Sequence, residues 1–169
     1  MAKLAKTAGN SGDLGEARFM LKSIDPLLNA DVLHALRSMG HGDELVLVDT
    51  NFPAESVARL SGIGKLLRME NATAARAAKA VLSVMPLDSF VPAPVLCMDV
   101  IDKPGESLPV QTEVQREVDA AEGKSLPMGR VERFAFYELA KKAYCIILTG
   151  ERRFFGNFIL KMGVIPPEA

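Results

Sequence analysis

Short apolar segments that recur between turn residues are the feature that most constrains the fold of this chain. The runs "ELVLV" from Glu44, "PVLCMDVI" from Pro94, "YCIILT" from Tyr144 and "FILKMGV" from Phe158 each have the length of a buried strand. "SVARL" from Ser56 is expected to form a further short strand. Gly, Pro, Asn and Asp residues beside such runs are typical of turns. A sheet of short, buried strands is therefore expected.

Segments with the helical spacing of apolar residues separate these strands. Asn29 is expected to cap the first helix and Gly40 to end it. Asn71 is expected to cap an Ala-rich helix that stops at Pro86. The helices are expected over residues 29–40, over 71–85, around Val110, Val114 and Val118, and over 131–143. Because helices alternate with short strands, the sequence predicts an α/β fold, a single layered domain with a largely parallel sheet.

Length and composition narrow the class of protein. A chain of 169 residues without a repeat or linker fits one domain. The net charge of −1 argues against a nucleic-acid or anionic-membrane surface. The most apolar window contains Asp88 and three prolines, so it falls short of the ~20 apolar residues of a membrane-spanning helix. Cys97 and Cys145 lie far apart without CxxC spacing, which predicts buried free thiols and a cytoplasmic location.

The start of the chain differs from the rest. Residues 1–19 are small, polar and Gly-containing, and they lack the apolar core of a signal peptide. They are expected to form a mostly disordered N-terminal extension. The folded domain is then expected over residues 20–169.

Two polar residues stand where a site would be expected. Asp49 ends a predicted strand, and ligands of α/β sheets bind beyond the carboxyl ends of strands. Asp49 could equally start a turn. His41 lies between two glycines, where a small molecule could approach an imidazole that gives and takes protons near neutrality. The alternative is a solvated loop histidine, and His34 in the first helix is expected to be a surface residue.

Other candidates are weaker. Arg133 and Tyr137 lie one helical turn apart and could face a ligand together, or be a surface arginine and a half-buried ring. Asn157 follows Gly156 in a loop and could be a turn residue. The glycines of "SGIGKLL" match neither the dinucleotide fingerprint nor the P-loop. No zinc spacing, serine nucleophile elbow or EF-hand loop occurs, so these patterns alone predict an α/β domain with a polar site.

Six segments, in order, resemble the ribose pyranase and L-fucose mutarotase family. They are "MLKSIDPLL", "MGHGDELVLVDTNFPAES", "VLSVMPLDSF", "ERFAFYELAKKA", "LTGE" and "GNFILKMGV", and they span nearly all of residues 20–165. "GHGDE" and "RFAFYE" are more similar to the fucose branch. The resemblance implies a cytoplasmic mutarotase that exchanges the anomers of L-fucose or a related sugar without cofactor or metal. It also implies rings of five subunits, often stacked as decamers, with sites near the subunit interfaces.

The same resemblance assigns roles to individual residues. His41 takes the place of the family's proton donor, and Asp49 and Arg133 take the places of substrate-binding residues. The family's Tyr-Gly-Asn segment falls on the segment Phe155, Gly156 and Asn157, so a tyrosine hydroxyl is missing here. That departure leaves two alternatives open. One is a sugar-binding protein with little turnover, and the other is an isomerase of the ribose pyranase type that exchanges pyranose and furanose forms.

Anomer exchange explains why a histidine would lie between two glycines. The ring oxygen must gain a proton while the anomeric hydroxyl loses one, and the reverse occurs on closure. One catalyst therefore serves as acid and base, which an accessible imidazole can do. Asp49 could orient a sugar hydroxyl or the imidazole, and Arg133 and Asn157 could hold neighbouring hydroxyls.

Overall fold

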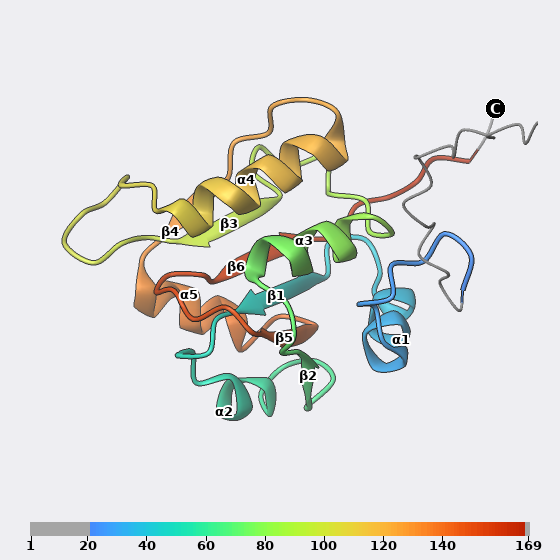
Figure 1. Ribbon diagram of the computed structural model, residues 1–169, viewed down its shortest axis with the longest axis horizontal. Coiled ribbons are helices and arrows are strands. Elements are labelled where there is room, and N and C mark those ends of the chain that lie inside the picture. Colours follow the sequence, from blue (N-terminus) through green and yellow to red (C-terminus); the bar gives the residue numbers. More distant parts are fainter. Residues whose placement is uncertain (1–20, 168–169) are drawn as a thin grey trace, which may run out of the picture.

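The computed structural model describes residues 21–167, and the predicted N-terminal extension over residues 1–19 lies outside this part. Helices and strands alternate along most of it (Figure 1). The elements are α1 (Ala30–Ser38), β1 (Glu44–Val48), α2 (Ala54–Ala58), β2 (Leu66–Met69), α3 (Ala74–Leu82), β3 (Val95–Met98), α4 (Pro109–Glu122), β4 (Gly129–Val131), α5 (Arg133–Ala140), β5 (Cys145–Thr149) and β6 (Phe158–Lys161).

The strands form one sheet in the order β2-β5-β1-β6-β3-β4. β5 is parallel to β1 and β2, and β3 is parallel to β4. β6 runs antiparallel to both of its neighbours, β1 and β3. The predicted α/β fold with a largely parallel sheet is confirmed, with β6 as the reversed strand. β1 lies between β5 and β6, which explains why its sequence is a continuous apolar run.

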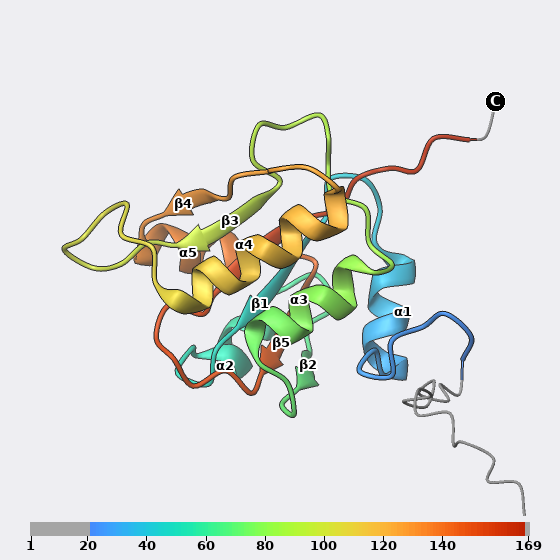
Figure 2. The same cartoon turned by 45° about the horizontal axis from the view of Figure 1, so that its top comes forward.

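Helices cover both faces of the sheet (Figures 1 and 2). Leu45 and Leu47 of β1 pack into one core with residues of α1, α3 and α4. Val46 and Val48 pack into a second core with residues of α2 and α5. This division follows from the geometry of a strand, in which successive side chains point to opposite faces. The result is a three-layer domain with β1 at its centre.

The first two predicted helices are present, with one changed cap. The Asn29 side chain accepts a hydrogen bond from the Val32 amide at 3.0 Å, so Asn29 caps α1 as predicted. The N-cap of α3 is Thr73, whose Oγ1 accepts from the Arg76 amide, so the expectation of a cap at Asn71 is wrong. Either residue type can cap a helix, so pattern alone did not separate them.

One predicted strand, one strand that was not predicted and the start of one predicted helix need correction. "SVARL" is not a strand, because it overlaps α2, whose buried residues Ala54, Val57 and Ala58 follow helical spacing. β2 was missed, because Arg68 interrupts its apolar residues and a Gly-rich segment precedes it. The start of the predicted 131–143 helix belongs to β4, and the helix itself begins at Arg133.

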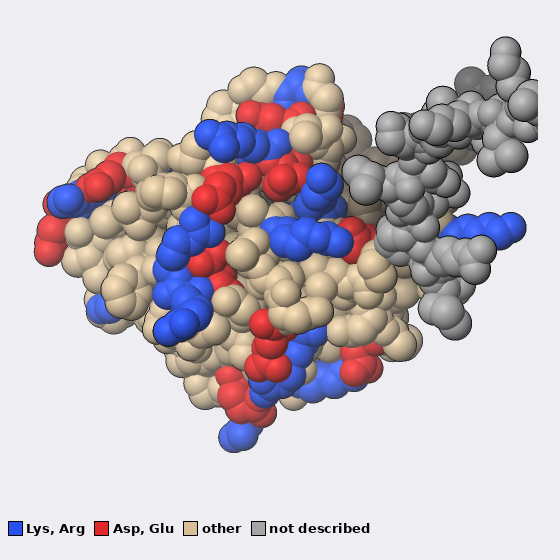
Figure 3. Space-filling view, viewed as in Figure 1, with Lys and Arg blue, Asp and Glu red and all other residues tan. Residues whose placement is uncertain are grey.

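The face drawn in Figure 3 carries mixed charges, and both cysteines lie in the interior. Acidic and basic side chains alternate over the α3–α4 face, without a broad area of one sign (Figure 3). Within residues 21–167, no helix is long and apolar enough to cross a bilayer. Cys97 and Cys145 are buried and free, as predicted. Burial raises the pKa of the Cys145 thiol to about 12.

Candidate functional site

Asp49 follows the carboxyl end of β1 and is only 2% exposed. Its Oδ1 accepts hydrogen bonds from the amides of Asn51 at 2.9 Å and Phe52 at 3.1 Å. Its Oδ2 accepts from the Gly156 amide at 3.1 Å and from Asn157 Nδ2 at 2.9 Å. Burial raises the pKa of the Asp49 carboxyl, and these donors oppose the rise. The carboxylate thus holds the loop after β5 against the turn after β1.

Asn157 also accepts a hydrogen bond from Asp49. Its Oδ1 accepts from the Asp49 amide at 3.0 Å, so the two side chains are joined reciprocally. The Gly156 amide reaches Asp49 Oδ2, and a Cβ at this position would meet Glu151 Cγ at 2.8 Å and Asp49 Cβ at 3.4 Å. Gly156 is therefore required for the close approach of the two segments. The Gly-Asn pair is more than a turn signal.

A cavity of about 320 Å³ opens beside this pair. Five of the predicted site residues line it: Asp49, Arg133, Tyr137, Phe155 and Asn157. The rest of its wall is mainly apolar and consists of Asn51, Phe52, Met98, Ile101 and Phe154. Two larger hollows, about 400 and 540 Å³, lie beside α2 and include only Tyr137 among the predicted residues, and a third of about 330 Å³ includes only Arg133. The 320 Å³ cavity is therefore the candidate binding site.

Arg133 and Tyr137 enter this cavity from α5. Arg133 is the first residue of the helix, and its guanidinium lies 4.5 Å from the centre of the Phe134 ring. Within residues 21–167, Arg133 Nε is the one buried side-chain nitrogen or oxygen without a hydrogen-bond partner. The Tyr137 ring packs edge-on against Phe52, with ring centres 5.2 Å apart. Arg133 thus offers a buried donor to a ligand, beside a fixed aromatic ring.

Phe155 has a strained backbone. Its φ is +60°, in the left-handed region that a residue with a side chain rarely adopts. Such strain costs about 1–3 kcal/mol and persists only where surrounding contacts impose the conformation. Phe155 is half-buried and packs against the core on the α2–α5 face. The loop after β5 therefore presents the Phe155 ring to the cavity in a conformation that its neighbours must maintain.

His41 lies at the opposite end of β1 and is absent from this cavity. It occupies a tight turn in which Gly42 has a φ of +87°, a conformation that favours glycine. His41 Nε2 lies 3.2 Å from Asp88 Oδ1, and its ring centre is 5.5 Å from that of Phe90. β1 alone spans roughly 16 Å. Within one chain, the idea that Asp49 orients the imidazole is therefore wrong, because Asp88 does so.

Asp88 is the main residue that the sequence analysis missed. It is buried, and its Oδ1 also accepts from the Phe90 amide at 3.0 Å. This backbone donor, with His41, lowers the pKa of the Asp88 carboxyl, so the carboxylate is ionised beside the imidazole. The end of β6 aligns both groups, because Lys161 O accepts from the Asp88 amide and Met162 O from the Gly42 amide. The signal available in the sequence was a lone carboxylate in an otherwise apolar window.

His34 is exposed on α1, as expected. Across the described chain, no group of three or more His, Cys, Asp and Glu side chains could hold a metal ion.

Comparisons with known proteins place the chain among sugar-related proteins. A fucose mutarotase from Bos taurus is 42% identical over 153 residues, which cover 88% of this chain and 97% of that protein. The structure of the fucose mutarotase from Streptococcus pneumoniae in complex with L-fucose superimposes with a TM-score of 0.76 at 35% identity, covering 86% of this chain and 100% of that one. A third structure, described as a candidate sugar binding protein, has a TM-score of 0.86 at 62% identity, with 88% and 99% coverage.

The family expected from the six sequence segments is confirmed by these relatives. The match to the RbsD / FucU transport protein family spans residues 22–165, and this range is most of the described chain. The chain belongs to the RbsD / FucU transport protein family.

Proposed function

We propose that this protein is a sugar mutarotase, an isomerase that exchanges the α and β anomers of L-fucose or a related aldose. The observation that carries the proposal is the 320 Å³ cavity, where Asp49, Arg133 and Asn157 meet an apolar wall in a chain whose relatives are named fucose mutarotase. A few convergent polar groups in a mostly apolar cavity are typical of small-molecule sites. Polar side chains can bond the sugar hydroxyls while the rings contact its C–H face.

The apolar wall supports a deoxy sugar as substrate. Met98, Ile101, Phe154 and Phe155 offer carbon and sulfur surface rather than hydrogen-bond partners. A hydroxyl buried against such a wall would lose its bonds to water, whereas a methyl group would gain from burial. L-fucose is a deoxy sugar with a methyl group, so it fits this wall better than its hydroxylated counterpart would.

The proposed reaction is ring opening and closure with proton transfer by His41. The bond between the anomeric carbon and the ring oxygen breaks as the ring oxygen gains a proton and the anomeric hydroxyl loses one. Rotation of the resulting aldehyde, followed by closure with the opposite proton movements, gives the other anomer. Asp88 fixes the orientation of the imidazole through its contact with His41 Nε2. General acid–base assistance of this kind contributes typically 10²–10⁴-fold.

His41 and the cavity are too far apart to act on one sugar within a single chain. We therefore infer that the site is shared, with His41 of the partner subunit facing the cavity. Exposed apolar side chains support contact at both places, because Phe90 beside His41 is 73% exposed and Phe154 at the cavity is 69% exposed. Large exposed rings of this kind are typical of interaction surfaces. A ring of five subunits, alone or stacked as a decamer, is the assembly that the family resemblance favours.

Saturation-transfer NMR tests the proposed reaction. Exchange between anomers is measured for L-fucose, ribose, galactose and arabinose, with and without the protein. Faster exchange of L-fucose with catalytic amounts of protein is expected. Exchange at the spontaneous rate for all four sugars would contradict the proposal.

A sugar-binding protein with little turnover is the second candidate. Phe155 favours it, because phenylalanine offers no hydroxyl where the family resemblance expects tyrosine. The 62%-identical structure described as a candidate sugar binding protein also favours it. Titration calorimetry with L-fucose separates the two candidates. Binding without accelerated exchange would support the second candidate over the first.

A further inference from the structure

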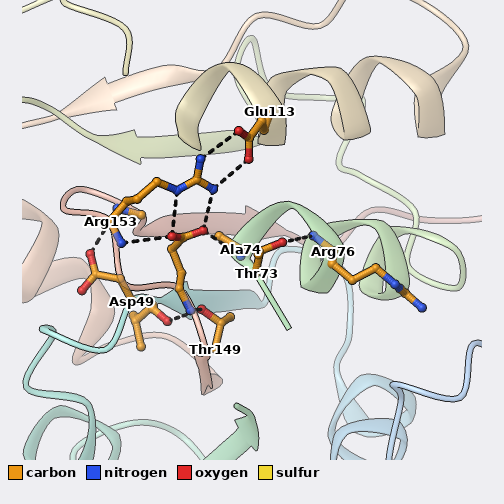
Figure 4. A network of polar contacts seen from close by, with 10 residues as sticks. Asp49, Thr73, Ala74, Arg76, Glu113, Thr149 and Arg153 are labelled. Carbon is orange, nitrogen blue, oxygen red and sulfur yellow. Dashed lines mark hydrogen bonds and ion pairs between the residues drawn. The ribbon is translucent and has the colours of Figure 1, made fainter. Parts of the chain in front are cut away.

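An ion-pair cluster with one buried member, Glu151, links the loop after β5 to α4 behind the candidate site (Figure 4). It consists of Glu151 and Arg153 of the loop and Glu113 of α4. We propose that Glu151 and Arg153 are positioning residues that hold Phe155, Gly156 and Asn157 in their sugar-binding arrangement. This inference rests on the proposed sugar site and assigns its geometry to residues that do not line the cavity.

Glu151 is the buried centre of this cluster and is only 3% exposed. Its Oε1 accepts from the Arg153 amide at 3.0 Å and from Arg153 Nε at 2.9 Å, and its Oε2 accepts from Arg153 Nη2 at 2.8 Å. Oε2 also lies 3.4 Å from the Ala74 amide, in the first turn of α3. A buried carboxylate requires such partners, because an unpaired one is costly. The loop therefore folds around Glu151.

Arg153 connects this centre to a second helix. Its Nη1 and Nη2 donate to Glu113 Oε1 and Oε2, both at 2.8 Å, in the two-bonded geometry that arginine and carboxylate favour. Figure 4 shows Arg153 between the loop and Glu113. The arginine side chain thus joins the loop to α4, while Glu151 joins it to α3. Because α3 and α4 pack against each other in one core, the loop has a rigid support.

The cluster and the binding residues are in direct contact through Gly156. The position of a Cβ on Gly156 lies 2.8 Å from Glu151 Cγ and 3.4 Å from Asp49 Cβ, so the glycine is sandwiched between the two carboxylate side chains. Thr50 also donates its amide to Glu151 O at 2.8 Å, which ties the turn after Asp49 to the loop. A shift of Glu151 must therefore move Gly156, and with it Phe155 and Asn157.

A role in geometry fits these groups better than a role in stability alone. Exposed ion pairs contribute little to folding, and the Arg153 side chain is 41% exposed. Arg153 nevertheless donates to two carboxylates, and it lies in the loop segment that carries the strained Phe155. Displacing a binding group by even about 1 Å can cost on the order of 10²-fold in rate.

The test is kinetics of L-fucose exchange with Arg153→Met. We expect KM to rise about tenfold or more while kcat changes less than about threefold, because the binding loop moves and His41 does not. Glu113→Gln, on α4, should raise KM by a smaller factor and keeps the inference testable if Arg153→Met does not fold. Arg152→Met is the matched control, because it removes the same charge from an exposed side chain one residue away. Its KM and kcat should equal those of the wild type.

The kinetic pattern distinguishes positioning from folding. If the cluster served stability only, the variants would lower the folded fraction, and apparent kcat would fall with KM unchanged. That result, or an unchanged KM and kcat in both Arg153→Met and Glu113→Gln, would overturn the inference. If the wild-type protein shows no exchange, the proposed function fails instead. The Kd for L-fucose then tests the positioning role. An equal Kd in wild type and Arg153→Met would refute that role, and so would the absence of binding.

Discussion

The two ends of β1 hold their polar residues in different ways. At the carboxyl end, Asp49 is 2% exposed and accepts four hydrogen bonds from its own chain. At the amino end, the His41 side chain is 46% exposed and contacts the Asp88 carboxylate and the Phe90 ring. Folding of one chain thus fixes the Asp49 end, which we propose is the binding end, whereas the His41 end, which we propose is the proton-transfer end, is left open. We infer that assembly completes it.

The largest expected effect is at the open end. His41→Ala should slow L-fucose exchange by ~10²–10⁴-fold, because it removes the proposed acid and base. Stability and assembly should change little, because the side chain is exposed. Saturation-transfer NMR and light scattering measure the two properties. His34→Ala, which removes an exposed histidine from α1, is the control and should retain exchange. Near-wild-type exchange by His41→Ala would remove His41 from the mechanism.

The same substitution at both ends sharpens the comparison. Asp49→Asn replaces one acceptor oxygen by an amide, so two of the four donors, most of them buried, lose their acceptor. Unpaired buried donors cost about 1–3 kcal/mol each, and relief of the buried charge offsets part, so a loss of roughly 2–4 kcal/mol is expected. Asp88→Asn keeps an oxygen for the Phe90 amide and should cost far less. Urea unfolding measures both, and equal losses would contradict the distinction.

Acid titration of stability probes the support of the binding end. Hydrogen bonds from Arg153 lower the pKa of Glu151 to about 2, below its ordinary value. Such a carboxylate stabilises the folded protein at pH above about 4.5, and this contribution is lost as pH falls towards about 2. Glu151→Gln should therefore be less stable at pH 7 and lose less stability on acidification, as measured by urea unfolding at several pH values. An unchanged pH dependence would contradict the ionised cluster.

Phe155→Tyr is expected to have the smallest effect, and only on binding. A tyrosine hydroxyl in the cavity could bond a sugar oxygen, which is worth about 0.5–1.5 kcal/mol. That corresponds to a roughly two- to tenfold gain in kcat/KM for L-fucose. The gain should lie in KM, because the proton-transfer end is untouched. A slower reaction with every sugar would indicate a cavity built for a substrate without a polar group at this position.

Short sequence patterns correctly singled out one polar residue at each end of β1. Asp49 after a buried strand and His41 in a glycine turn were both visible, because each depends on a few adjacent residues. Their separation was not recognised, although a strand between two residues places them at opposite edges of a sheet. The partners Asp88, Glu151, Arg153 and Glu113 were missed, because their contacts depend on how distant segments pack. β2 and β4 were missed for a local reason, because each is short and its apolar residues are interrupted by an arginine.

Subunit complementation tests the shared site most directly. His41→Ala lacks the proposed acid, and Arg133→Met lacks a binding group, so each variant alone should be almost inactive. In rings assembled from an equal mixture, roughly a quarter of the interfaces pair an intact His41 with an intact cavity, if assembly is random. L-fucose exchange should then recover to about a quarter of the wild-type rate once native mass spectrometry confirms mixed oligomers. Mixed oligomers as inactive as either parent would contradict a site shared between subunits.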